Sequence, residues 1–139
     1  MWHSQGRTDS IPALTALEPE NFVEMNSADA RDLGVWTGDR VRITSASNGA
    51  GVIGRVKVVE GIRPGVIAVS HSRGRWEINS RPYWLDGKPT AVDPRRGRGL
   101  TINPVLRVDP SLGDVPLQEP IGGSVSFFDT RVKVEKLIG

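Results

Sequence analysis

Short runs of alternating apolar and polar residues dominate the first half of the chain. The alternation extends over 39–45 and again over 52–59, and a period of two is typical of half-buried β-strands. A short, continuously apolar run at 66–70 indicates another strand, and 22–25, 125–128 and 131–137 provide three more candidates. We therefore expect six or seven short strands, each bounded by turns that contain glycine or proline.

One short helix is predicted between the first two strands. Asn26 or Ser27 can cap its start, because a side-chain oxygen there accepts a backbone N–H that has no partner within the helix. Gly34 can adopt the left-handed conformation that ends a helix. The pattern thus predicts a helix at about 27–33, and the glycines of 48–51 predict a turn between two strands.

Residues 73–123 depart from the strand pattern, since they are dense in Gly, Pro, Arg and Asp. A loop of this length is improbable in a compact domain unless it wraps a ligand or packs on a neighbour. Within it, 104–108 fits a short helix or a strand equally well. The residues alone therefore predict a mainly β domain, a small barrel that leaves no exposed strand edges, with a long functional loop.

Composition narrows the class of protein. A chain of 139 residues is one domain that can bury a core, and 37% hydrophobic residues with 16 Gly and 10 Pro suit a turn-rich β protein. No apolar run approaches the roughly 20 residues that cross a bilayer, so we expect no direct membrane insertion. The absence of cysteine excludes disulfides, iron–sulfur ligation and thiolate catalysis within these residues.

Positive charge is concentrated in one part of the chain. Residues 71–107 contain seven Arg and one Lys against three acids, whereas the formal net charge of the whole chain is only +2. This distribution indicates one anionic partner at one place. The basic run 93–99 could bind nucleic acid, but it lacks the interleaved aromatics that stack on unpaired bases. The alternative is an ordered loop whose arginines pair with acids of a partner surface.

A polar cluster follows the apolar strand at 66–69, and it is our first candidate site. Ser70, His71, Ser72 and Arg73 come directly after the strand. Hydroxyls and backbone N–H groups at a strand end suit a phosphate, and Arg73 could add charge-assisted hydrogen bonds. The ordinary alternative for His71 is a histidine whose ring bonds a backbone carbonyl.

Catalytic groups and metal ligands are not expected in this chain. Its two histidines, at 3 and 71, have no metal-ligand spacing. Ser70, His71 and Ser72 are neighbours on an extended chain and point to alternate faces, so they cannot form a proton relay. Trp76 and Trp84 are expected to pack over a neighbouring surface rather than to stack on a base.

The segment 26–43, N-S-A-D-A-R-D-L-G-V-W-T-G-D-R-V-R-I, resembles the C-terminal molybdopterin dinucleotide-binding domain of the molybdopterin oxidoreductases (DMSO reductase family). The family pattern there reads roughly N-x-x-D-A-x-x-L-G-I-x-x-G-D-x-V. The resemblance extends over about 3–137 and implies a double-psi β barrel with one or two short helices. It also implies that 1–139 is a single domain, the C-terminal part of a larger catalytic subunit.

The same resemblance implies a site for molybdopterin guanine dinucleotide. Asn103, in I-N-P-V-L, matches the family asparagine whose amide binds the nucleotide end, and an amide both donates and accepts hydrogen bonds. We expect the strand end at 70–73 and Asn103 to meet the N-terminal loop W-H-S-Q-G-R-T on one concave surface. That loop comprises Trp2, His3, Ser4, Gln5, Gly6, Arg7 and Thr8. The metal (Mo or W) and any iron–sulfur cluster would be held with the help of other domains.

Three further motifs, S-H-S-R-G-R-W-E, D-P-R-R-G-R-G and G-G-S-x-S-F-F-D-T-R-V, resemble the catalytic subunits of tetrathionate reductases. They imply a sulfur-oxyanion reductase of anaerobic respiration, with a separate electron-transfer subunit, in a periplasmic or membrane-associated complex. The isolated domain is then expected to show no redox turnover. Phe128 departs from the lysine that several nitrate reductase relatives have before the last strand. The competing hypothesis is a free-standing β barrel that binds nucleic acid or protein through the Arg-rich loop.

Overall fold

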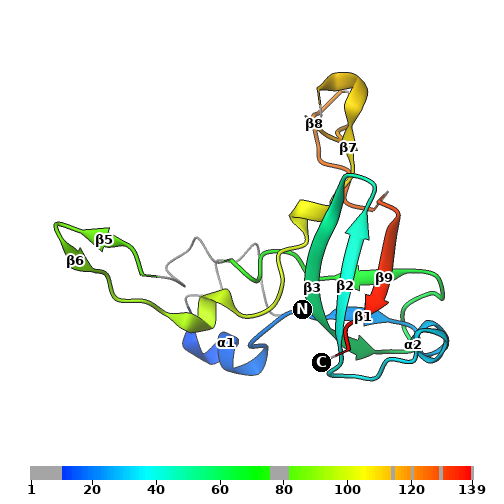
Figure 1. Ribbon diagram of the computed structural model, residues 1–139, viewed down its shortest axis with the longest axis horizontal. Coiled ribbons are helices and arrows are strands. Elements are labelled where there is room, and N and C mark those ends of the chain that lie inside the picture. Colours follow the sequence, from blue (N-terminus) through cyan, green and yellow to red (C-terminus); the bar gives the residue numbers. More distant parts are fainter. Residues whose placement is uncertain (1–10, 76–81, 114, 120, 129, 139) are drawn as a thin grey trace.

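A five-stranded sheet forms the body of the protein (Figure 1). The computed structural model describes residues 11–75, 82–113, 115–119, 121–128 and 130–138. The strand order is β4-β1-β3-β2-β9, in which β1 lies parallel to β3 and the other neighbours are antiparallel. The bounds are β1 Val23–Met25, β2 Arg40–Ser45, β3 Asn48–Val58, β4 Ile67–Val69 and β9 Val132–Lys136.

The predicted helix is confirmed as α2, Ser27–Leu33. The Asn26 side chain accepts a hydrogen bond from the Ala28 N–H at 2.9 Å, and Gly34 ends the helix with a φ of 64°. The Asn26 amide also donates to the carbonyl of Ile62 at 2.9 Å. One residue therefore caps the helix and fixes it to the turn before β4. A second short helix, α1 Pro12–Leu17, precedes β1.

The core lies on one face of the sheet, as the alternating pattern predicts. Val23, Met25, Val41, Ile43 and Val56 are fully buried, and burying each such side chain contributes roughly 1.5–3 kcal/mol. The positions that alternate with them include Arg55 and Lys57, which form ion pairs with Glu20, ahead of β1, and with Glu24, within β1. The hydrophobic pattern alone thus specifies which face of the sheet is covered.

The long segment after β4 is not structureless. It contains two small hairpins, and Figure 1 shows that they project from the sheet in different directions. The hairpins are β5 Trp84–Leu85 with β6 Lys88–Pro89, and β7 Val108–Asp109 with β8 Val115–Pro116. Among the described residues of this segment, three turns of 3-10 helix accompany them: η2 Pro94–Gly97, η3 Asn103–Val105 and η4 Pro110–Leu112. The ambiguous stretch 104–108 is therefore part helix and part strand.

Two expected elements are wrong in detail. The turn expected at 48–51 lies instead at Ala46 and Ser47. Residues 48–51 belong to β3, because the pairing of β2 with β3 shifts its register next to them. Within this stretch, the side-chain oxygen of Asn48 accepts hydrogen bonds from the N–H groups of Ala50 and Gly51. The strand expected at 125–128 reduces to one bridge between Val125 and Gln118.

The mainly β class is confirmed, although the main sheet has five strands rather than six or seven. In the part of the chain that the structure describes, no ladder joins the edge strands β4 and β9, so a double-psi closure remains a prediction. No helix in that part is long and apolar enough to cross a membrane.

Candidate functional site

A hollow of about 480 Å³ lies at the point where the end of β4, the residues around η3 and the segment after β8 meet. Four of the residues predicted from the sequence, His71, Ser72, Arg73 and Asn103, line it together. Ser70 lines a neighbouring hollow instead, and the predicted residues Trp2–Thr8 lie outside the described part of the chain. Among the residues that the structure describes, the lining is His71, Ser72, Arg73, Arg75, Thr101, Ile102, Asn103 and Phe127.

His71 is oriented by its neighbours. Its ring nitrogen Nδ1 lies 2.6 Å from the Ser72 hydroxyl, so its partner is a side chain and not the backbone carbonyl that the ordinary alternative required. Ser72 has a φ of 72°, a conformation that costs a residue other than glycine about 1–3 kcal/mol and occurs preferentially at functional sites. On the other side, the His71 ring faces the ring of Phe127. The imidazole is thus held at its edge by the Ser72 hydroxyl, and one of its faces lies toward an aromatic ring.

Arg73 has a more structural position than its sequence suggests. Its side chain is buried, and its Nη2 donates to the carbonyl of Glu18 at 2.5 Å. The guanidinium therefore fastens the end of β4 to the connection between α1 and β1. Arg75 is half-buried and lines the hollow as well.

Asn21 is an important residue that sequence reasoning missed. It is buried, and its amide nitrogen donates to the carbonyls of Ser70 at 2.5 Å and Leu100 at 2.9 Å. Its oxygen accepts from the Leu100 N–H at 2.8 Å. The partners lie 49 and 79 residues away, so no local signal in the sequence could reveal them. Asn21 thus joins the two segments just before they form the hollow, at Ser70 ahead of His71 and at Leu100 ahead of Thr101.

A second junction lies beside it. The Thr101 hydroxyl is 2.9 Å from the carbonyls of both Arg73 and Gly74. Gly74 has a φ of 68°, and a side chain there would meet the backbone of Leu100 and Thr101 at about 2.5 Å. Only glycine lets the two segments approach this closely.

Asn103 is available for a ligand. Its side chain is exposed and makes no hydrogen bond to any residue that the structure describes, while its backbone carbonyl accepts from Leu106 at the end of η3. An amide in this state offers two donors and an acceptor. The same part of the chain contains no group of His, Cys, Asp or Glu that could hold a metal. The exposed Asn103 amide is therefore placed to contact a ligand in the hollow.

The basic run near η2 makes contacts within itself. Arg95 forms an ion pair with Asp93, with Nε 2.8 Å from Oδ1, and this hydrogen bond raises the pKa of the Arg95 guanidinium. Asp93 also caps η2 by accepting from the Arg95 N–H. Arg95 is thus engaged with its own loop. Its position is explained without either of the contacts considered from the sequence, which were binding to nucleic acid and pairing with the acidic residues of a partner surface.

Comparison with known proteins places these residues in a wider group. The family model described as "Molydopterin dinucleotide binding domain" matches residues 1–104. A selenate reductase subunit of Mesobacillus selenatarsenatis is 44% identical over 136 residues, which cover 90% of this chain and 13% of that protein. A tetrathionate reductase subunit of Salmonella typhimurium is 36% identical over 104 residues, 75% of this chain and 10% of that protein. The chain thus spans only a small part of these relatives.

Proposed function

The chain belongs to the molydopterin dinucleotide binding domain family, and from this premise we propose that the hollow lined by His71, Ser72, Arg73, Arg75 and Asn103 is where it holds the dinucleotide. The observation that supports this most directly is the charge of the lining, which includes two arginines and no carboxylate among the described residues. The positive charge of these arginines favours a pyrophosphate there, and it acts through the local potential as well as through contacts, since the Arg73 Nη2 already donates to the carbonyl of Glu18.

The neighbouring hollow gives a useful contrast. It is larger, at about 600 Å³, but Glu18 and Glu24 line it together with Lys57. Two carboxylates would repel the phosphates of a dinucleotide, and the Lys57 ammonium is already paired with Glu24 at 3.1 Å. The size of the hollows therefore favours the neighbouring one, whereas the charge of their linings favours the hollow that contains His71 and Asn103. For an anionic ligand we give charge the greater weight.

The lining fits the chemical groups of molybdopterin guanine dinucleotide. The Asn103 amide can both donate to and accept from a heterocycle edge, and hydroxyls at Ser72 and Thr101 and the Arg75 guanidinium suit the sugar and phosphate oxygens. When bound, the cofactor supplies the metal through which electrons reach a substrate. The part of this chain is to bind the cofactor, orient it and exclude water.

The whole protein, on this proposal, is the catalytic subunit of a molybdenum or tungsten oxidoreductase that reduces an oxyanion, with 1–139 as one of its domains. The names of the relatives support the class, since they refer to selenate, tetrathionate and arsenate. The tetrathionate expectation from the sequence motifs is one member of that class. Other domains of the same polypeptide, an electron-transfer partner and a periplasmic or membrane-associated location belong to the same proposal.

Cofactor content of the whole protein that carries this chain tests the site. Asn103→Leu should lower the molybdenum or tungsten per polypeptide, and the guanosine monophosphate released by acid hydrolysis, about tenfold, as expected when a contact of about 1.4 kcal/mol is lost. The unfolding temperature of the cofactor-free protein should stay unchanged, because the Asn103 side chain is exposed. Glu60→Leu, at an exposed position that does not line the hollow, is the matched control. Wild-type cofactor content in Asn103→Leu would refute the site.

A further inference from the structure

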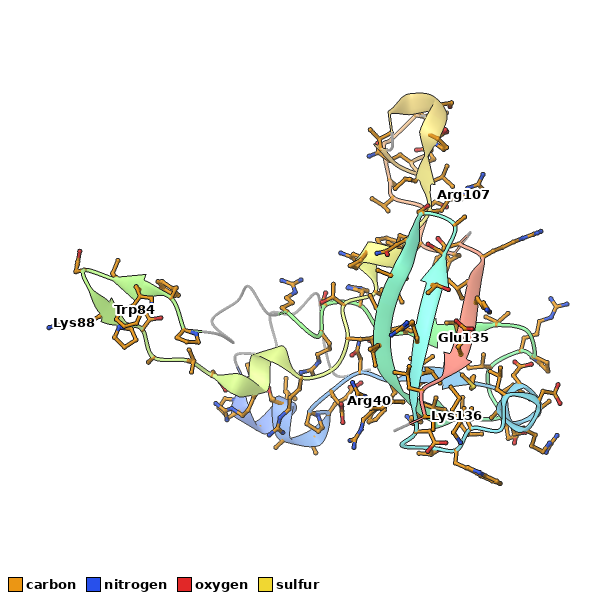
Figure 2. The ribbon with its side chains drawn as sticks, in the orientation of Figure 1. Arg40, Trp84, Lys88, Arg107, Glu135 and Lys136 are labelled. Atoms are coloured by element: carbon orange, nitrogen blue, oxygen red, sulfur yellow. The ribbon has the colours of Figure 1, made fainter. Side chains whose placement is uncertain are left out.

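The β5–β6 hairpin carries large apolar side chains that the described residues leave uncovered. Tyr83, Trp84 and Leu85 are 56%, 71% and 60% exposed, and Figure 2 shows Trp84 on an element that projects far from the sheet. Single exposed apolar residues are ordinary on protein surfaces, but a contiguous group of them marks a site of interaction. The hollow does not explain this group, because none of the three residues lines it.

The hairpin owes its shape to local turn chemistry rather than to packing. Asp86 and Gly87 form its turn with φ values of 49° and 72°. Positive φ at both central residues defines a type I′ turn, for which Asp-Gly is a favoured sequence. The Thr90 N–H donates to the Tyr83 carbonyl at 2.8 Å and extends the pairing by one residue on each strand. An isolated two-stranded hairpin is only marginally stable in water, so contact with another surface would make this preformed shape permanent.

Both faces of the hairpin are apolar. Neighbouring residues on a strand point to opposite faces, and residues paired across antiparallel strands share a face. Trp84 pairs with Pro89, so these two share one face. Tyr83 and Leu85, on either side of Trp84 in the strand, lie on the other. A ribbon that rested on a flat surface would need only one apolar face. Apolar side chains on both faces therefore indicate a ribbon enclosed between two apolar walls.

The rest of the same polypeptide is the partner that best fits such a ribbon. The chain covers 13% of the selenate reductase subunit and 10% of the Salmonella tetrathionate reductase subunit, so most of each relative lies outside the matched part. Surfaces that stay buried permanently are more apolar than surfaces that bind and release. A linked domain is also present at a high effective concentration. A ribbon with two apolar faces suits a permanent contact of this kind.

We propose that the β5–β6 hairpin is a docking arm, inserted between two apolar surfaces of the same polypeptide outside residues 1–139. The arm rests on the proposed function, because only a chain that is one domain of a larger subunit has such surfaces. It attaches the domain to its neighbours through residues that do not line the hollow. Docking of the arm and binding of the cofactor can therefore be measured separately.

Photo-cross-linking in the whole protein that carries this chain tests the insertion. The photoreactive residue p-benzoylphenylalanine replaces Trp84 on one face or Leu85 on the other, and mass spectrometry identifies the peptides that it joins. The two positions should cross-link to two different segments of the same polypeptide, both outside residues 1–139. Cross-links from both positions to one segment would overturn the insertion between two walls. Cross-links to a second polypeptide, or none from either position, would overturn the arm.

Amide exchange in the same protein provides a second measurement. Trp84→Ser should accelerate exchange over 83–90 about tenfold or more, because a released hairpin opens easily. Trp84→Phe should retain the protection. Trp36→Ser is the matched control, since Trp36 is 73% exposed between α2 and β2, and it should leave exchange of the hairpin unchanged. Unchanged exchange at Val41 and Val56 verifies that the sheet stays folded. The effect belongs to the whole protein, because Trp84 is exposed in the 139-residue chain itself.

Cofactor content of the same samples separates the arm from the proposed function. A wild-type protein that contains molybdopterin guanine dinucleotide, but whose hairpin exchanges as fast as an unstructured peptide, would overturn the arm and leave the function standing. Intramolecular cross-links in a wild-type protein that never acquires the dinucleotide would support the arm and reject the function.

Discussion

The five-stranded sheet and the long segment 73–128 are held in place by different forces. The sheet, α2 and Val35 contribute most of the buried core, whereas the long segment contributes only Leu100 and Val105 among the described residues. Figure 2 shows Trp84 and Lys88 on the β5–β6 hairpin, well away from the sheet. The segment also carries many exposed apolar side chains: Tyr83, Trp84, Leu85, Val92, Val115, Ile121, Val125, Phe127 and Phe128.

The contrast shows how this site is assembled. In the sheet, alternating hydrophobic residues decide the structure through burial. The long segment is attached at a few points, where Leu100 packs over Gly54, where Asn21 bonds Leu100, and where Thr101 meets Gly74. The candidate site lies at these attachments. Its geometry therefore depends on a few polar contacts more than on the core.

Truncating the core should have the largest effect. Ile43→Ala removes a fully buried side chain of β2 and should lower the free energy of unfolding by about 2–5 kcal/mol. Trp84→Ala removes a larger side chain, but one that is 71% exposed on the hairpin, and should change it by less than about 0.5 kcal/mol. Urea denaturation measures both. Comparable losses would contradict the division between the two regions.

The Asn21 junction should rank next. Asn21→Ala leaves the carbonyls of Ser70 and Leu100 and the Leu100 N–H without their partner, at a cost of about 2–4 kcal/mol. The effect should be local as well as global. Amide exchange at Leu100 should accelerate much more than at Val41 and Val56 in the sheet. A uniform loss of protection would mean that the segment is not attached through Asn21.

The division also explains what the sequence could predict. The helix at 27–33, its Asn26 cap and the strands around it follow from neighbouring residues, and the family match supports cofactor binding over the nucleic-acid alternative. The sequence also led us to expect His71 and Asn103 on one surface, and both line the same hollow in the structure. Their roles in binding stay a prediction that the cofactor-content experiment tests. The contacts of Asn21 were not predictable, because they depend on pairing across 79 residues. Phe127 was not predicted to line the hollow, because the sequence had placed it in a strand at 125–128 that the structure does not contain.

Gly74 and Gly65 allow a test of the close approach between the two regions. Both have positive φ, 68° and 80°, so alanine at either position costs about 1–2 kcal/mol in backbone strain. At Gly65 a side chain meets nothing within 4 Å, but at Gly74 it meets the Leu100 backbone. Gly74→Ala should therefore cost about 1–3 kcal/mol more than Gly65→Ala in thermal unfolding, because the packed segments must separate. If both substitutions lowered the stability equally, the segment around Leu100 would be able to move away from residue 74 at little cost.

The smallest expected effect is the pH dependence of an exposed ion pair in the sheet. Asp39 lies 3.0 Å from the Lys136 ammonium of β9, labelled in Figure 2, and accepts from the Trp36 N–H. The hydrogen bond to Lys136 is the main cause that lowers the pKa of Asp39 in the folded protein. A lowered folded pKa contributes stability that is present above the unfolded value, about 3.9, and is lost as the pH falls through the folded value.

Asp39→Asn should therefore reduce the fall in the free energy of unfolding that occurs in acid below about pH 4. Near pH 7 the dependence of that free energy on pH should stay almost the same. Asp109 provides the comparison in the long segment, because hydrogen bonds from Ser111 lower its pKa. Those bonds join residues only two apart, so part of the shift should persist in the unfolded chain and cancel from the free energy of unfolding. Urea midpoints between pH 2.5 and pH 7, chosen to bracket a carboxyl titration of about 3.9, should respond more to Asp39→Asn than to Asp109→Asn. The reverse order would mean that acid acts first on the projecting segment and not on the sheet.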